Sequence, residues 1–192
     1  KPEKQKEYAE VIFQTTKRLS ELISNILKLN KLEKQAITPV AEEYDLCGQL
    51  AECAVNYEPV WEKKDIGFDA DMEDSIKITA DAVLMEIVWN NLFSNAVKFT
   101  EPGGTIKLTE QSDDSEIRVS VEDNGCGFSP EMLASFPVKE DNGHVGLSNL
   151  YHTLQLIYGP AASLHISNAE PNGARVTIFL PEEENHAHPS RG

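Results

Sequence analysis

The segment 91–98 has the sequence NLFSNAVK and places three polar side chains at helical spacing. Asn91 and Asn95 are four residues apart and Lys98 follows three residues later, so on a helix they share one face. An amide oxygen is a neutral, hard ligand that can hold Mg²⁺ beside a polyphosphate, and a lysine offsets phosphate charge. The spacing therefore predicts a site for phosphate and Mg²⁺. For Lys98 alone, the alternative is a surface lysine that suits the carboxyl end of a helix.

A second segment, Asp123 to Gly127, has the sequence DNGCG and follows the alternating run IRVSVE at 117–122. The alternation predicts a half-buried strand that ends at Asp123. A carboxylate there can accept a hydrogen bond from an exocyclic amine, while Gly125 and Gly127 let the backbone approach a flat ring. The pattern predicts adenine recognition. Its alternative is an ordinary Asp-Asn-Gly surface turn, and the asparagine segment favours the nucleotide site.

At these segments the chain resembles a known family, the ATP-binding domains shared by sensor histidine kinases, DNA gyrase, Hsp90 and mismatch-repair ATPases. Segment 91–98 is similar to the family's N box, segment 123–127 to its G1 box, and segment 143–149 (GHVGLSN) to its G2 region. The resemblance covers roughly residues 38–181. It implies a two-layer α/β sandwich of a mixed sheet and helices, the Bergerat type.

The resemblance also implies roles for individual residues. ATP would be held with Mg²⁺ through Asn95, with Asn91 and Lys98 at the phosphates and Asp123 reading the adenine. The loop residues implied to approach the nucleotide are Gly125, Gly127, Gly143, His144, Gly146 and Leu147.

Asn91 separates two branches of this family. The branches that hydrolyse ATP carry a glutamate four residues before the metal asparagine, as the base that activates water. An amide cannot accept a proton at neutral pH, so Asn91 disfavours a self-contained ATPase. It favours transfer of the phosphoryl group to a separate acceptor, as in the kinase branch.

The amino-terminal segment predicts a long helix from about Pro2 to Gln35 that packs in a coiled coil or helical bundle. It resembles the second helix of the dimerisation and phosphoacceptor hairpin of sensor kinases, which implies a homodimer. The phosphorylated histidine of that family lies on the first helix, and we expect it to be absent here. The apolar seam alternates spacings of four and three through Tyr8, Ile12, Thr15, Leu19, Leu22, Ile26 and Leu29.

The composition has a formal net charge of −15, which argues against nucleic-acid binding because a polyanionic backbone would be repelled. No run of about 18 apolar residues and no signal peptide is present, so we expect a cytoplasmic fragment without membrane contact. It could belong to the cytoplasmic part of a membrane-bound sensor. The three cysteines form no C-x-x-C pair and predict reduced thiols.

The expected domains are residues 1–37 (hairpin helix), 38–181 (ATP-binding domain) and 182–192 (flexible tail). Within the middle domain, periodicity and turn residues predict strands and helices, and one segment without clear periodicity would be a mobile lid over the triphosphate. We expect strands at 42–46, 66–70 and 76–79, helices at 48–63, 82–99 and 146–158, hairpins at 105–110/116–122 and 163–167/174–180, and the lid at 128–145.

The sequence thus predicts a catalytic fragment of a two-component sensor histidine kinase. It would transfer the γ-phosphate of Mg-ATP to a histidine on a helix absent from this chain, with a response regulator as a further partner. Two residues depart from the family pattern: His144 stands where many relatives have glycine, and Ala174 where relatives have a threonine near the adenine-reading aspartate. They motivate the alternative, a degenerate nucleotide-binding signalling scaffold without kinase activity.

Overall fold

The computed structural model describes residues 38–113, 115–137 and 145–181. The chain divides into two compact units, Lys1–Pro39 and Val40–Gly192, and the fold below is that of the second. The predicted helix at 2–35 and the predicted tail at 182–192 lie outside the described residues.

Within the described residues, the strands form two sheets. The strands are β1 (Glu42–Asp45), β2 (Gly67–Asp71), β3 (Lys77–Ala80), β4 (Thr105–Ser112), β5 (Glu116–Asp123), β6 (Ser163–Asn168) and β7 (Ala174–Pro181). The larger sheet has the order β2-β4-β5-β7-β6, with β2 parallel to β4 and the other neighbours antiparallel. β1 and β3 pair in a separate antiparallel ribbon. The larger sheet is therefore mixed, as expected.

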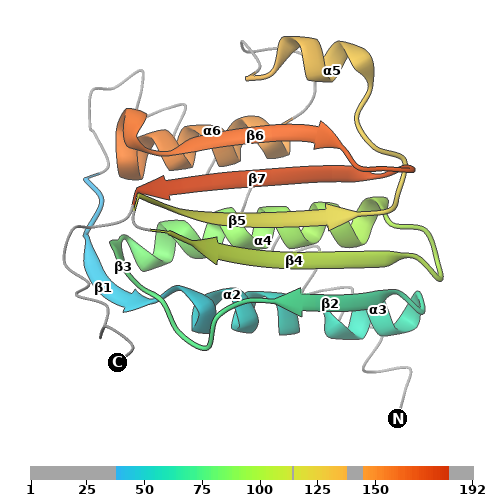
Figure 1. Cartoon of the computed structure of the whole chain (residues 1–192), viewed down its shortest axis with the longest axis horizontal. Helices are drawn as coiled ribbons and strands as arrows, with labels where there is room; N and C mark the ends of the chain where they lie inside the picture. The colour runs from blue at the N-terminus through green and yellow to red at the C-terminus, as the bar shows by residue number, and fades with distance from the viewer. Residues whose placement is uncertain (1–37, 114, 138–144, 182–192) are drawn as a thin grey trace. The chain divides into compact units, whose positions relative to one another are not determined.

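Helices connect the strands, and three of them form a second layer. The helices are α2 (Leu46–Val55), α3 (Glu58–Lys63), α4 (Ala82–Phe99), α5 (Pro130–Ser135), α6 (Val145–Tyr158) and the 3-10 turn η1 (Gly159–Ala161). Figure 1 shows α2, α4 and α6 behind the five-stranded sheet, on one of its faces. This arrangement confirms the predicted two-layer α/β sandwich with a mixed sheet.

The hydrophobic core lies between the sheet and the helices. On β5, Ile117, Val119 and Val121 are buried while Arg118 is exposed, which confirms the alternation of the predicted strand. The largest side chains that are fully buried come from both layers: Trp89, Phe93, Leu46, Leu50, Met85, Ile106, Leu108, Ile117, Leu150, Leu154, Ile178 and Leu180.

Helix α4 begins and ends at the residues predicted from the sequence. Asp81 is its N-cap: one carboxylate oxygen accepts from Leu84 N at 3.0 Å and the other accepts from Val40 N at 2.9 Å. Such a cap satisfies an amide that the first helical turn leaves without a partner. The cap fixes where α4 starts, and hence the register of the asparagines further along it.

The predicted continuous helix at 48–63 is wrong, because the structure has two helices, α2 and α3, in this region. Pro59 lies in the first turn of α3, where its missing N–H costs nothing. In one continuous helix, its ring would clash with the carbonyl of Val55 and a hydrogen bond would be lost. The break buries Tyr57, whose hydroxyl donates to Asn90 O of α4 at 3.0 Å.

The segment predicted as a lid, 128–145, contains a short helix, α5, that the sequence analysis did not predict. Ser129 caps this short helix by accepting from Met132 N at 3.2 Å, and Pro130 occupies its first turn. A serine followed by proline is a helix-start signal. Residues 138–144 of the predicted lid lie outside the described residues.

Among the helices that the structure describes, none has the length and apolar character needed to span a membrane.

Candidate functional site

The two asparagines of the predicted phosphate site lie on α4, half-buried between core residues. Asn91 donates from Nδ2 to Ile87 O of its own helix at 2.9 Å, and no other hydrogen bond is formed by this side chain within the described residues. Its amide oxygen is therefore left for another donor. Asn95, one turn further on, faces the first turn of α6 through its side chain: a Cβ built on Gly146 would lie 3.3 Å from Asn95 Nδ2.

The G2 glycine and leucine have different environments. Gly146 is half-buried, and its lack of a side chain lets the backbone of α6 come close to Asn95. Leu147 is buried in the hydrophobic core, so only its backbone could reach a ligand at this site. Gly143 and His144, the other two predicted residues of this segment, lie outside the described residues.

Asp123 is the last residue of β5 and is buried, with 7% of its surface exposed. Its Oδ1 accepts from Gly125 N at 2.9 Å and from Ala174 N at 3.4 Å. Burial raises the pKa of Asp123, while the two backbone donors oppose that shift. Both hydrogen bonds of this carboxyl within the described residues reach Oδ1, which leaves Oδ2 for another donor.

The turn after Asp123, residues 124–128, is here called the adenine turn, after its predicted role. It packs on the carboxyl end of α4: a Cβ built on Gly125 would lie 2.2 Å from Phe99 O. Gly127 adopts a φ of 70°, in the left-handed region that glycine tolerates best. The structure thus brings the adenine turn and the start of α6 into contact with α4, the predicted phosphate helix.

The loop between β6 and β7 covers the other side of the adenine turn. Gly173 has a φ of 123°, and a Cβ built on it would lie 1.8 Å from Asp123 O. Asn168 and Asn172 of this hairpin hydrogen-bond the turn's backbone. The sequence predicts the hairpin but not the role of either asparagine, because a polar residue in a turn carries no local sign of its distant partner.

Lys98, predicted to contact phosphate, is exposed at the end of α4. Its Nζ lies 4.7 Å from the ring centroid of the neighbouring Phe99, which is a cation–π distance. A different lysine, missed from the sequence, caps this helix end. Lys64 Nζ donates to Val97 O at 2.8 Å and to Thr100 O at 2.9 Å, so its charge meets the negative end of the helix dipole.

The departure at Ala174 has a specific consequence in the structure. Ala174 has no hydroxyl to offer, but its backbone N–H points at Asp123 Oδ1. The hydroxyls of Ser120 and Thr177 form a separate pair across β5 and β7, 3.0 Å apart. The aspartate is therefore held by backbone donors.

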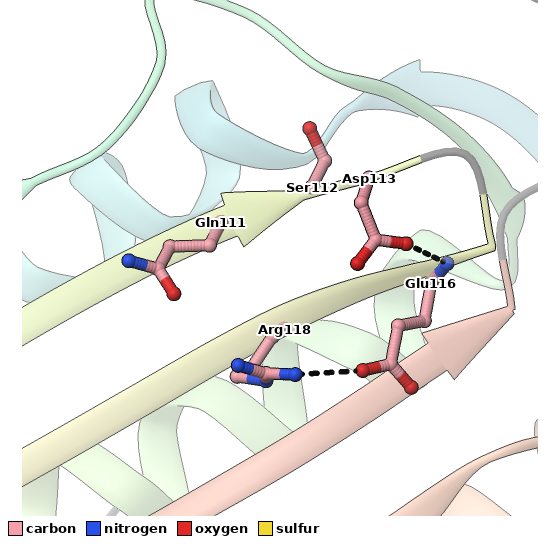
Figure 2. Close-up of a pocket in the computed structure, with 5 residues that line it drawn as sticks. All are labelled: Gln111, Ser112, Asp113, Glu116 and Arg118. Carbon is pink, nitrogen blue, oxygen red and sulfur yellow. Dashed lines mark hydrogen bonds and ion pairs between the residues drawn. The ribbon is translucent and has the colours of Figure 1, made fainter.

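A surface hollow of about 270 Å³ lies at the tip of the β4–β5 hairpin (Figure 2), at the opposite end of β5 from Asp123. Its polar groups pair among themselves: Arg118 forms an ion pair with Glu116 at 2.8 Å, and Asp113 Oδ1 accepts from Glu116 N at 3.2 Å. The hollow is formed by Gln111, Ser112, Asp113, Glu116 and Arg118. It contains none of the predicted site residues.

A mixed five-stranded sheet with helices on one face, and the turn 124–128 against the end of α4, define a two-layer α/β sandwich. A family model described as "Histidine kinase-, DNA gyrase B-, and HSP90-like ATPase" matches residues 80–184. The match covers more than half of the chain, and the chain belongs to this family. The resemblance drawn from the three short segments is thereby confirmed.

The similar proteins are sensor histidine kinases. The circadian input-output histidine kinase CikA of Synechococcus elongatus is 28% identical, over 94% of this chain and 26% of that protein. The sensor protein CopS of Pseudomonas syringae pv. tomato is 33% identical, over 60% of this chain and 23% of that protein. The chain spans 26% to 37% of the length of the first curated relatives it matches.

Two solved structures are similar in fold. Histidine kinase ThkA in complex with response regulator protein TrrA gives a TM-score of 0.73 at 24% identity, covering 96% of this chain and 53% of that one. Full-length ShkA in complex with AMPPNP gives a TM-score of 0.68 at 25% identity, covering 93% and 39%. Both comparisons support the same fold.

Proposed function

We propose that this chain is the ATP-binding catalytic part of a sensor histidine kinase and takes part in transfer of the γ-phosphate of Mg-ATP to a histidine on a separate helix. The proposal rests on one observation above all: α4 contacts both other parts of the candidate site, the first turn of α6 at Asn95 and the adenine turn at Phe99. Asn91 supports the kinase branch, because an amide cannot act as the base for water activation.

Asp123 would recognise the adenine base. A free Oδ2 on a largely buried carboxyl can accept a hydrogen bond from the exocyclic amine. Gly125 and Gly127 let the adjoining turn pack closely against the end of α4 and against the β6–β7 hairpin, which supports the carboxyl. A hydrogen bond to a charged group in such a site contributes about 1.5 to 3 kcal/mol.

Asn95 would hold Mg²⁺ through its amide oxygen, together with phosphate oxygens of the nucleotide. Its half-buried side chain beside Gly146 fits this role, since amide oxygens are hard ligands and the helix start supplies backbone N–H groups. When bound, Mg²⁺ neutralises charge on the phosphates. Asn91 and Lys98 would contact the phosphates, and Gly143, His144, Gly146 and Leu147 would contribute backbone or side-chain contacts to them.

The family relationship supports three further parts of the proposal. The amino-terminal helix would mediate a homodimer, a response regulator would receive the phosphoryl group, and the chain would function in the cytoplasm without membrane contact of its own. ThkA, whose structure contains a response regulator, provides the precedent for the second.

Titration calorimetry of the whole chain with Mg²⁺ and a non-hydrolysable ATP analogue tests the nucleotide site. We expect saturable heat, and an affinity at least about tenfold weaker for Asp123→Asn, because an amide cannot match the carboxylate as an acceptor. Asp69→Asn, at an exposed position of β2, is the matched control and should bind like the wild type.

Phosphoryl transfer is tested with labelled ATP and a separate helical hairpin that carries an acceptor histidine. Label on the hairpin supports the kinase. Absence of saturable heat at millimolar nucleotide would instead support the signalling scaffold without kinase activity. Release of phosphate in the absence of the hairpin would support a self-contained ATPase.

A further inference from the structure

Asn168, the last residue of β6, holds the end of the adenine turn with both ends of its side-chain amide. Its Oδ1 accepts from Phe128 N at 2.6 Å, and its Nδ2 donates to Phe128 O at 3.1 Å. One side chain therefore satisfies both backbone groups of a single residue in the turn. The same Oδ1 would lie 2.9 Å from a Cβ built on Gly127, so amide and turn are in direct contact.

Asn172, in the loop between β6 and β7, holds the beginning of the turn. Its Nδ2 donates to Asn124 O at 2.7 Å and lies 3.4 Å from Gly125 O. These two carbonyls belong to the residues directly after Asp123. The turn is thus fixed at both ends by side-chain amides from one hairpin.

Neither asparagine is part of the hydrophobic core, because both residues are exposed. What they contact is backbone that contains two glycines and adopts a positive φ at Gly127. Glycine-rich backbone has many accessible conformations, so without the amides the turn would lose order. Asp123 is held at Oδ1 by Gly125 N, which lies within that turn.

We propose that Asn168 and Asn172 are positioning residues that hold the adenine turn in the shape needed to distinguish a 6-amino purine from a 6-oxo purine. This inference rests on the proposed function. The distinction depends on the direction of Asp123 Oδ2, since a carboxylate attracts an amine and repels a carbonyl oxygen at the same position. A misplaced turn weakens the attraction and relieves the repulsion together.

The test compares Mg-ATP with Mg-ITP, whose base has a carbonyl oxygen in place of the amine. Dissociation constants are measured for the wild-type chain, Asn168→Ala, Asn172→Ala and the double variant. We expect the ratio of the ITP to the ATP dissociation constant to fall about threefold to tenfold in each single variant, the effect of one lost hydrogen bond, and further in the double variant.

Two additional variants serve as a control and as an intermediate case. Glu170→Gln changes an exposed residue of the same loop that forms no hydrogen bond within the described residues, and it should keep the wild-type ratio. Asn168→Asp keeps the acceptor for Phe128 N but loses the donor to Phe128 O, so its ratio should lie between those of the wild type and Asn168→Ala. If Asn168→Ala does not fold, Asn172→Ala and Asn168→Asp decide the question.

A purely structural role would lower the thermal midpoint and leave the nucleotide ratio unchanged, and that result overturns the inference while the proposed function stands. A wild-type chain that binds neither nucleotide overturns both. A reduced ratio in the asparagine variants, with Glu170→Gln unaffected, supports the positioning role.

Discussion

Glu110 on β4 is a carboxyl group buried on the core side of the sheet, with 4% of its surface exposed. Its Oε2 accepts from Glu73 N at 3.2 Å and lies 3.9 Å from Cys47 Sγ, while its buried Oε1 has no partner among the residues that the structure describes. Burial raises the pKa of Glu110. Burial also raises the pKa of the Cys47 thiol, to about 12, so this neighbour stays protonated and can donate.

Glu110→Gln should change how stability depends on pH. A carboxyl whose pKa is higher in the folded state favours folding only while it is protonated. Its ionisation therefore lowers the free energy of unfolding as the pH rises above the ordinary glutamate value. We therefore expect the difference in free energy of unfolding, variant minus wild type, to increase by on the order of 1 kcal/mol as the pH is raised from 4.5 to 8. Urea unfolding at several pH values measures this difference.

Glu43→Gln, at an exposed position of β1, is the control for loss of one negative charge. A Glu110→Gln curve parallel to the wild-type curve at all pH values would contradict the prediction.

Gly173 lies against the backbone of Asp123. Gly173→Ala introduces a Cβ that would lie 1.8 Å from Asp123 O, at a φ of 123°, so the hairpin or the strand end must move. We expect the free energy of unfolding to fall by about 3 kcal/mol or more, and nucleotide binding to weaken because Asp123 moves. Gly159→Ala is the matched control: its φ is 57°, but nothing lies within 4 Å of the added atom. For Gly159→Ala we expect the free energy of unfolding to fall by only about 1 kcal/mol. Equal losses in thermal unfolding would contradict the steric argument.

At the scale of elements, α4 connects the core to the candidate site. Its apolar side packs in the core, and its amino end is capped by Asp81. Its carboxyl end is capped by Lys64, which follows α3 and donates to three carbonyls of residues 97, 98 and 100. Lys64 directly follows α3, so the break between α2 and α3 at residues 56–57 affects where this lysine lies.

Lys64→Met should destabilise the protein by about 1 to 2 kcal/mol, because the carbonyls lose a charged donor while the apolar part of the side chain is retained. Lys63→Met changes the exposed neighbouring lysine and is the matched control. The comparison uses midpoints of urea unfolding at neutral pH. If the two variants unfold at the same urea concentration, the cap contributes nothing measurable.

At the scale of the whole molecule, the formal net charge of −15 opposes the binding of any polyanion. ATP without a metal carries more negative charge than Mg-ATP, so it should experience the larger repulsion. Salt screens such long-range interactions, with a Debye length of about 10 Å at 0.1 M.

Affinity for the ATP analogue without Mg²⁺, measured in EDTA, should therefore increase about twofold to fivefold when NaCl is raised from about 20 mM to about 200 mM. With Mg²⁺ present, the same change in salt should have a smaller effect. The measurement is a calorimetric or fluorescence titration at each salt concentration. Weaker binding at high salt in EDTA would mean that local cations such as Lys98 outweigh the net charge.

Much of the fold could be predicted because its signals are local. The bounds of α4 follow from a capping aspartate and a helical apolar pattern, and the β4–β5 and β6–β7 hairpins follow from alternation and turn residues. Two features that were not predicted also have local signals. Pro59 marks the first turn of α3, and Ser129 followed by proline marks the start of α5. Asn91, Asn95 and Asp123 were singled out because their side-chain chemistry is specific at their spacing.

Most of the helices and strands, and the family resemblance, can be read from residues close together along the chain, with the exceptions of the break between α2 and α3 and of α5. What holds the candidate site depends instead on tertiary packing. Asn168 and Phe128 are 40 residues apart, Asn172 and Asn124 are 48 apart, and Lys64 and Val97 are 33 apart. No local pattern encodes such partners, because a side-chain amide or ammonium can bond any backbone group that the packing of the sheet and helices brings within reach.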